Sequence, residues 1–284
     1  MQLEEGRLLK DFTTFGIGGP AKYFIQVTTI SQLQEVIRFC QEKSLRYFVL
    51  GKGSNSLFSD QGFDGVIILN KIHFIEETAG EFYVGAGYSF SLLGSQTARK
   101  GWEGLEFASG IPGTVGGAVF MNAGANGTET FESLTEVTYV NEKGEIETLP
   151  KAQIEWGYRH TSFHEKKGAI AAARFQLKAS TFARKKQLDL IDYRTKTQPY
   201  SDQSAGCVFR NAPSSSAGQL IQEAGLKGFA MGGAEVSTLH ANFIVNKGNA
   251  TAEDVISLAK HVQNTVQEKT GQFLEMEIRV IPYN

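Results

Sequence analysis

The sequence contains three clusters of glycine that are flanked by hydroxyl and amide side chains. They read Thr13-Thr14-Phe15-Gly16-Ile17-Gly18-Gly19-Pro20-Ala21, Leu50-Gly51-Lys52-Gly53-Ser54-Asn55 and Gly110-Ile111-Pro112-Gly113-Thr114-Val115-Gly116-Gly117-Ala118, the third continuing to Asn122-Ala123-Gly124-Ala125. Glycine tolerates positive φ and lets backbone N–H groups approach an oxyanion without a Cβ in the way. One such cluster is most simply a turn. Three of them in one half of the chain predict loops that bind an extended diphosphate.

The two common nucleotide-binding signatures are absent from these clusters. No strand is followed by a G-x-G-x-x-G turn that opens a helix, and no G-x-x-x-x-G-K-[ST] loop occurs. A Rossmann dehydrogenase and a P-loop NTPase are therefore disfavoured. His160 and His164 lie four residues apart, but no third ligand accompanies them in the sequence, so we expect no metal site.

The composition of the 284 residues is that of an ordinary globular protein, with 41% hydrophobic and 20% charged residues. The net charge of −2 disfavours a nucleic-acid partner, which needs a basic surface. The acidic N-terminus differs from a signal peptide, and no apolar run approaches the roughly 18 residues of a membrane span. With Cys40 and Cys207 as the only cysteines, we expect a soluble protein of the reducing cytoplasm, without membrane or obligate protein partners.

Hydrophobic periodicity predicts the elements that hold the glycine loops. A strand over residues 23–27 precedes a helix capped by Ser31, and a buried strand over residues 47–50 leads directly into the second glycine cluster. Such a β-α-β unit ending in a glycine turn is a common phosphate site. Further strands are expected at residues 66–69, 82–84, 137–140 and 172–177, with a helix over residues 89–100.

The character of the sequence changes near Thr181, where we place a domain boundary. Residues 183–188 predict a charged helical connector, and helices are expected over residues 217–224 and 251–269. The second of these helices would be capped by Thr251 with Asp254 and would end near Gly271. In the last segment, Leu274, Met276, Ile278 and Val280 alternate with Glu275, Glu277 and Arg279, which predicts a strand. Periodicity alone does not say which of the two glutamates has a function.

Seven motifs, in order along nearly the whole chain, resemble those of the UDP-N-acetylenolpyruvoylglucosamine reductases, flavoenzymes of peptidoglycan precursor synthesis. They are residues 14–21, residues 50–55, Gly104-Leu105-Glu106-Phe107 with residues 110–124, Tyr158-Arg159, Ala205-Gly206-Cys207-Val208-Phe209-Arg210-Asn211, His240-Ala241-Asn242-Phe243-Ile244-Val245-Asn246 and Leu274-Glu275-Met276-Glu277-Ile278-Arg279. Their compact spacing is more similar to the family's second type, which lacks an inserted tyrosine loop over the substrate.

The resemblance implies an α+β fold. A PCMH-like FAD-binding module of two subdomains would span residues 1–180, with a split near residues 60–70. A smaller α+β substrate-binding domain would span residues 181–284, and its last strand is free to pack back on the first module. The boundary near Thr181, drawn from composition, fits this plan.

The resemblance also implies the reaction. NADPH reduces bound FAD and leaves, and UDP-N-acetylglucosamine enolpyruvate then accepts hydride at C3 and a proton at C2 to give UDP-N-acetylmuramate. This step serves cell wall biogenesis, and with it cell shape and division. Because charge develops beside the substrate carboxylate, the site must supply positive charge and a proton donor.

Three residues would carry the catalytic roles. Arg159 would stabilise the enolate and the carboxylate, although its alternative is a surface ion pair, and Thr161 replaces the serine of the usual Tyr-Arg-x-Ser motif. Cys207 stands where most members have a serine proton donor; its alternative is a small buried hydrophobe. A thiol of ordinary pKa, about 8.5, stays mostly protonated at neutral pH. Glu277 would assist at the enol, unless it belongs to a solvated strand face.

The binding residues follow from the same resemblance. The FAD contacts would be Gly51, Lys52, Gly53, Ser54, Asn55, Gly110, Ile111, Pro112, Gly113, Thr114, Gly116, Gly117, Ala118, Asn122 and Gly124. The UDP-sugar contacts would be Tyr158, Arg194, Lys196, Asn211, His240 and Asn242. Two alternatives stay open: another flavoprotein of this FAD-binding class, such as an alcohol or sugar-lactone oxidase, and a non-catalytic nucleotide-binding module.

Overall fold

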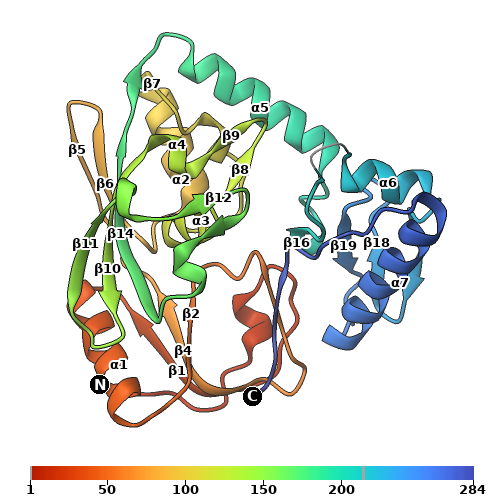
Figure 1. Ribbon diagram of the computed structural model, residues 1–284, viewed down its shortest axis with the longest axis horizontal. Helices are drawn as coiled ribbons and strands as arrows, with labels where there is room; N and C mark the ends of the chain where they lie inside the picture. The colour runs from red at the N-terminus through yellow and green to blue at the C-terminus, as the bar shows by residue number, and fades with distance from the viewer. Residues whose placement is uncertain (1, 213–214) are drawn as a thin grey trace. The chain divides into compact units, whose positions relative to one another are not determined.

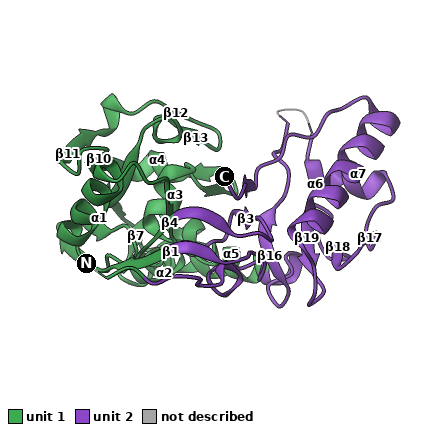
Figure 2. Cartoon of the chain, turned by 90° about the horizontal axis from the view of Figure 1, so that it is seen from below, with its two compact units in different colours: residues 1–3, 24–52, 66–194 green, residues 4–23, 53–65, 195–284 purple. Residues whose placement is uncertain are grey.

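The computed structural model describes residues 2–212 and 215–284 (Figure 1). They form two compact units, which Figure 2 distinguishes by colour: residues 2–3, 24–52 and 66–194, and residues 4–23, 53–65 and 195–284. The division falls within the strands β1 (Ala21–Val27) and β4 (Phe63–Asn70) and near the end of the helix α5 (Ala183–Thr197). The compact units are discontinuous in sequence. The assignment of FAD binding to residues 1–180 and of substrate binding to residues 181–284 stays a prediction.

An antiparallel sheet in the order β11-β10-β14-β6-β5 is the centre of the first unit. Its strands are β5 (Ile75–Thr78), β6 (Glu81–Gly85), β10 (Leu134–Asn141), β11 (Ile146–Pro150) and β14 (Gly168–Gln176). The register pairs Val137 with Ala173 and Ala173 with Val84, and all three side chains are fully buried. These alternating positions direct one face of the sheet into the core of the unit.

Short helices cover this face, and side-chain caps set where two of them begin. The Ser89 hydroxyl accepts from the Leu92 N–H at the start of α2 (Phe90–Arg99), and the Thr114 hydroxyl accepts from the Gly117 N–H at the start of α3 (Val115–Phe120). Together with η2 (Glu106–Ala108) and α4 (Thr130–Ser133), they add their apolar side chains to the core. The Thr114 cap thereby places the third glycine cluster at the start of α3.

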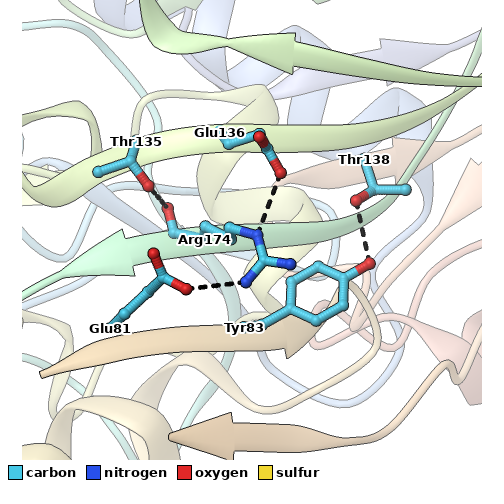
Figure 3. Close-up of polar contacts among 6 residues, drawn as sticks. All are labelled: Glu81, Tyr83, Thr135, Glu136, Thr138 and Arg174. Atoms are coloured by element: carbon cyan, nitrogen blue, oxygen red, sulfur yellow. Dashed lines mark hydrogen bonds and ion pairs between the residues drawn. The ribbon is translucent and has the colours of Figure 1, made fainter. Parts of the chain in front are cut away.

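The opposite face of the sheet carries a polar network that joins three strands (Figure 3). Arg174 of β14 lies between two carboxylates, with 3.1 Å from Nε to Glu136 and 2.9 Å from Nη1 to Glu81. Its guanidinium also lies 4.2 Å from the centre of the Tyr83 ring, and the Tyr83 hydroxyl is 3.0 Å from that of Thr138. The network holds β6, β14 and β10 in register on the side away from the core.

Smaller elements complete the first unit. They are α1 (Ile30–Glu42), β2 (Tyr47–Leu50), β7 (Trp102–Glu103), β8 (Gly124–Ala125), β9 (Thr128–Glu129), η3 (Lys151–Gln153), β12 (Trp156–Gly157), β13 (His160–Thr161), η4 (Ser162–His164) and β15 (Lys178–Ala179). The predicted cap of α1 at Ser31 is wrong, because Thr29 is extended and its hydroxyl accepts from the Gln32 N–H. The predicted strand before the second glycine cluster is confirmed as β2, which pairs in parallel with β4.

The second unit contains a sheet in the order β16-β19-β18-β17 with the helices α6 and α7. Its elements are η1 (Leu9–Phe12), β3 (Ser56–Phe58), β16 (Gln203–Cys207), α6 (Ala217–Glu223), β17 (Ala230–Met231), β18 (Ala234–Val236), β19 (Phe243–Asn246), α7 (Ala252–Thr270) and β20 (Arg279–Ile281). Thr251 and Asp254 form a capping box at the start of α7, and Gly271, with φ 72°, ends it. Both helix boundaries agree with the sequence-based prediction.

The last strand differs from its prediction. Leu274 and Ile278 are buried as expected, but Val280 is 37% exposed and Ile281 is buried. A bend at Ile278 shifts the alternation by one residue, and only Arg279–Ile281 forms a strand, which pairs in parallel with β3. Within the part of the chain that the structure describes, no helix has the length and apolar character needed to cross a membrane.

Candidate active site

In the first unit, residues of the second and third glycine clusters come together. A Cβ built on Gly51 would lie 2.4 Å from Oγ1 of Thr114, so the two loops touch at a point where no side chain fits. Gly116 is equally confined, because its Cβ would lie 2.9 Å from that of Ala86. The clusters are therefore more than separate turns, since the lack of a Cβ at Gly51 lets its backbone pack against the Thr114 side chain of the other loop.

These loops also expose hydrogen-bond donors that the protein does not use. Among the described residues, the backbone N–H groups of Lys52, Gly113 and Thr114 have no acceptor. The hydroxyl of Ser109, which is fully buried, likewise has no partner there. Of these residues, Thr114 and Ser109 are buried, and buried donors without partners are costly unless a ligand accepts from them. An anionic diphosphate is such a ligand, so the residues present fit FAD.

The second unit holds the remaining part of the second glycine cluster. Gly53 has φ 64°, and a Cβ on it would lie 2.5 Å from the Phe12 carbonyl oxygen. In the described chain, the N–H groups of Gly53, Ser54 and Asn55 also lack acceptors. Glycine is required at position 53 both by its backbone conformation and by the lack of space.

Arg159 lies in a two-residue hairpin loop of the first unit. β12 and β13 pair Gly157 with His160, which leaves Tyr158 and Arg159 as the loop. Arg159 has φ 55°, in the left-handed region, and its Nη2 donates to the Gly124 carbonyl over 2.7 Å. The guanidinium also lies 4.9 Å from the centre of the half-exposed Tyr158 ring. Arg159 is thus anchored at its backbone and at its tip.

Thr161 explains the departure of this motif from the usual Tyr-Arg-x-Ser pattern. Its hydroxyl donates to the Phe120 carbonyl over 2.7 Å, and the residue is fully buried. A serine hydroxyl has the same donor, so threonine at this position retains the anchor of the hairpin.

Asn122 is fully buried, and its side chain is occupied by other parts of the protein. Nδ2 donates to Glu129 and to the Gly157 carbonyl, and Oδ1 accepts from the Phe131 N–H. Both amide hydrogens are therefore used within the protein. A contact between Asn122 and FAD stays a prediction, and its amide N–H groups are not available for it.

Cys207 and Glu277 lie on neighbouring segments of the second unit. The Glu277 N–H donates to the Val208 carbonyl over 2.7 Å, and the Arg210 N–H donates to the Glu275 carbonyl over 2.9 Å. Both Cys207 and Glu277 are partly buried. Glu275 is exposed and pairs with Arg210 at 3.1 Å, which accounts for it as a surface ion pair. The structure therefore brings the predicted thiol and Glu277 to the same part of the unit.

Asn242 and His240 form hydrogen bonds that hold the segment directly after Cys207. The Asn242 amide accepts from the Phe209 N–H (2.9 Å) and donates to the Phe209 carbonyl (2.8 Å). Nδ1 of His240 accepts from the Asn242 N–H over 3.2 Å. Burial lowers the pKa of His240, and the positive charge of Lys227 adds to the effect. Their predicted contacts with the substrate stay predictions, and the geometry assigns both residues a supporting role.

The other predicted substrate residues lie on different elements. Asn211 is exposed, and its Oδ1 accepts from the Ala217 N–H at the start of α6. Arg194 is buried in the first unit, where Nη2 donates to the Gly110 carbonyl over 3.4 Å. Lys196 is exposed. Among the described residues, no group of three or more His, Cys, Asp or Glu is arranged to hold a metal ion.

Glu106 was not predicted as a site residue, yet it is 1% exposed. Its Oε2 accepts from the Gly104 N–H over 2.7 Å, and Oε1 lies 3.5 Å from the Lys186 ammonium of α5. The carboxylate thus fixes the turn that leads into the third glycine cluster. The signal in the sequence is an acid inside the apolar run Leu105-Glu106-Phe107-Ala108, where a charge needs a specific partner.

Comparison with known proteins decides the family. Residues 21–150 match the FAD binding domain, and residues 198–281 match the C-terminal domain of UDP-N-acetylenolpyruvoylglucosamine reductase. The chain is 57% identical over 284 residues to the UDP-N-acetylenolpyruvoylglucosamine reductase of Protochlamydia amoebophila, covering 100% of this chain and 95% of the relative. The chain belongs to the UDP-N-acetylenolpyruvoylglucosamine reductase family.

Further relatives agree with this membership. The enzyme of Chlamydia felis is 44% identical over 284 residues, covering 99% of this chain and 95% of the relative. The crystal structure of the Thermus caldophilus reductase superposes with a TM-score of 0.85 at 37% identity, covering 99% of this chain and 100% of that one. The expected α+β fold, with an FAD-binding domain before the reductase C-terminal domain, is confirmed. The alternatives of a sugar or alcohol oxidase and of a non-catalytic module are wrong.

Proposed function

We propose that this FAD oxidoreductase converts UDP-N-acetylglucosamine enolpyruvate to UDP-N-acetylmuramate with NADPH as hydride donor. The proposal depends chiefly on one observation, the full-length identity of 57% to a reductase of this name. The structure adds that the Arg159 guanidinium is held by the Gly124 carbonyl, and that the Glu277 N–H donates to the carbonyl of Val208, next to Cys207.

FAD, when bound, would supply the hydride acceptor and donor that links the nicotinamide to the enolpyruvyl group. The protein groups that fit its diphosphate are the unpaired N–H groups of Lys52, Gly113 and Thr114 in the first unit, with the Ser109 hydroxyl. Arg194, whose guanidinium holds the Gly110 carbonyl, would keep this loop in place.

The substrate makes two demands on the protein's own side chains. Reduction of the enolpyruvyl double bond builds negative charge beside the carboxylate, which the Arg159 guanidinium would stabilise. The proton for C2 would come from the Cys207 thiol, since a thiol is a donor at neutral pH unless its pKa is lowered. Glu277, on the adjacent segment, would orient and stabilise the enol that forms.

We also infer that the enzyme acts in the cytoplasm and is of the family's second type. Neither Cys40 nor Cys207 forms a disulfide among the described residues, which fits a reducing compartment. The compact motif spacing supports the second type.

The two half-reactions test the catalytic assignments separately. Arg159→Ala and Glu277→Gln should leave the anaerobic reduction of flavin by NADPH largely intact and slow its reoxidation by the enolpyruvyl substrate. The reason is that both residues are assigned to charge on the substrate and not on the nicotinamide. Equal losses in both half-reactions would show that the assignments are wrong.

Flavin retention tests the loops. Gly53→Val places a β-branched side chain where the Phe12 carbonyl leaves no space, at a residue with positive φ. The variant should purify with less FAD, measured as the ratio of absorbance near 450 nm to that of the protein. Gly127→Val is the matched control, because Gly127 also has positive φ but has nothing near its Cβ.

A further inference from the structure

The backbone of Arg159 is held in a conformation that an arginine adopts only under constraint. Its φ of 55° lies in the left-handed region, where an L-residue other than glycine, asparagine or aspartate is strained by about 1–2 kcal/mol. Such strain persists only where the surroundings fix the backbone more strongly than it relaxes. The contacts of the hairpin therefore identify what directs this side chain.

Asn122 makes the central contact. Its Nδ2 donates to the carbonyl of Gly157, the residue that enters the hairpin loop, over 2.9 Å, and to Oε2 of Glu129 over 2.8 Å. Its Oδ1 accepts from the Phe131 N–H, at the start of α4, over 3.1 Å. One fully buried amide thus joins the hairpin to the start of α4.

The segment that carries Asn122 also holds the other end of Arg159. The carbonyl of Gly124, two residues further on, accepts from Nη2 of Arg159 over 2.7 Å. Residues 122–124 consequently form hydrogen bonds with the Gly157 carbonyl, just before the loop, and with the Arg159 guanidinium. A shift of this segment would change the direction of the arginine.

We propose that Asn122 is a positioning residue, which holds the Gly157–Arg159 loop so that the guanidinium is directed at the substrate. The inference rests on the proposed role of Arg159. It assigns the Asn122 side chain to the substrate half of the reaction, whereas its motif would place it with the flavin loops. Its amide acts through Arg159 and touches neither substrate nor flavin.

A double-mutant cycle tests the proposal. Asn122→Ala should slow reoxidation of reduced flavin by the enolpyruvyl substrate by about 10–100-fold, the effect of a displacement of about 1 Å. At saturating substrate the rate should fall, while the apparent Kd for the substrate and the rate of reduction by NADPH stay close to wild type. In the Arg159→Ala background, Asn122→Ala should cause no further loss, because its effect passes through the missing side chain.

A second variant covers the case in which Asn122→Ala folds poorly. Asn122→Asp keeps the acceptor for Phe131 but loses both donated bonds and places a carboxylate beside Glu129, so it should slow the same step. Asn122 has a φ of 41°, so an alanine there is strained in its backbone as well. Asn126→Ala is the control, since Asn126 has a similar φ of 55° but is exposed. FAD affinity, measured by fluorescence, and the melting temperature are recorded for every variant.

The outcomes separate this inference from the proposed function. If the losses of Asn122→Ala and Arg159→Ala multiply, or if FAD affinity falls in proportion to the rate, Asn122 does not act through Arg159. If Arg159→Ala itself reoxidises at the wild-type rate, the proposed role of Arg159 fails and takes this inference with it.

Discussion

The Arg159 hairpin and the Cys207 segment hold a candidate catalytic side chain in two different ways. In the hairpin, the residue in the left-handed region is Arg159 itself, with φ 55°. In β16, it is Gly206, with φ 78°, directly before Cys207, where the pairing with β19 shifts register. The strain is therefore carried by the functional residue in the first unit and by a neighbouring glycine in the second. A glycine takes this conformation at little cost.

Each segment is also held by a buried asparagine, and the two amides are used differently. Asn242 binds both the N–H and the carbonyl of one residue, Phe209, on the segment after β16, where the Val208 carbonyl also accepts from the Glu277 N–H. Asn122 binds two separate segments, the start of α4 and the Arg159 hairpin. An amide that bonds both backbone groups of a single residue contributes mainly to stability. An amide that joins different segments also fixes the orientation of these segments relative to one another. The comparison predicts that substitution of Asn242 lowers mainly the stability of the protein, whereas substitution of Asn122 lowers the rate of the reaction.

Removal of the Cys207 thiol should give the largest effect. Cys207→Ala should bind and reduce flavin normally but lose about 10²–10⁴-fold in substrate-driven reoxidation, the range for a missing general acid. Cys207→Ser should keep substantial turnover, because a hydroxyl takes the same place. If Cys207 were a core residue, serine would cost more stability than alanine, so rates and melting temperatures of both variants are measured.

Cys40 provides the contrast for this experiment. It is 1% exposed, and burial raises the pKa of its thiol to about 11. Cys40→Ser should lower the melting temperature more than Cys40→Ala and change the reoxidation rate of the folded enzyme in neither case. If Cys207→Ala also has a higher melting temperature than Cys207→Ser, the two cysteines have the same structural role.

Asn242→Ala should affect mainly stability. It leaves the buried N–H and carbonyl of Phe209 without partners, which costs about 2–4 kcal/mol. Chemical denaturation should show this loss. Asn122→Ala should also lose stability, because the buried Phe131 N–H is left without an acceptor, but unlike Asn242→Ala it should slow the reoxidation of flavin as well. If Asn242→Ala instead slows only the reaction, the contrast between the two amides is wrong.

Backbone strain gives a smaller and matched pair of effects. Arg159→Gly should be more stable than Arg159→Ala by about 0.5–1 kcal/mol, since glycine relieves the left-handed strain. Gly206→Ala should lose about 1 kcal/mol, although nothing lies within 4 Å of the added Cβ. Melting temperatures of the three variants test whether glycine stabilises position 159 and whether alanine destabilises position 206. If Arg159→Ala is more stable than Arg159→Gly, the loop relaxes when the arginine is removed.

His240 should give the smallest effect, through pH. Burial lowers its pKa in the folded state, so the neutral form is favoured there and accepts from the Asn242 N–H. Its contribution to stability is complete above the unfolded pKa of about 6.5 and is lost as the pH falls toward the lower folded value. His240→Gln should therefore melt with a weaker dependence on pH below 6.5. His73→Gln serves as the control for removing a histidine, and an unchanged slope in His240→Gln would contradict the prediction.

Local signals in the sequence predicted a large part of this fold. The capping box of α7 and its glycine stop, the strand before the second glycine cluster and the connector helix α5 all depend on residues within a few positions of one another. The glycine clusters predicted diphosphate-binding loops, because close backbone approach requires glycine, and the resemblance of the ordered motifs implied an FAD reductase. Ser31 failed as a cap because Thr29, two residues earlier, competes for the same N–H.

Only the tertiary structure decided which distant groups meet. Gly51 touches Thr114, Glu106 holds Gly104 and faces Lys186, and the Asn122 amide reaches Gly157, 35 residues away. The bend at Ile278, after which Val280 is exposed, likewise depends on the parallel pairing of residues 279–281 with β3. Cap and periodicity signals act over one or two turns of the chain, whereas these contacts depend on how whole elements pack. The glycine loops and the family were therefore readable from the sequence, but the contacts that Asn122 makes with the Arg159 hairpin were not.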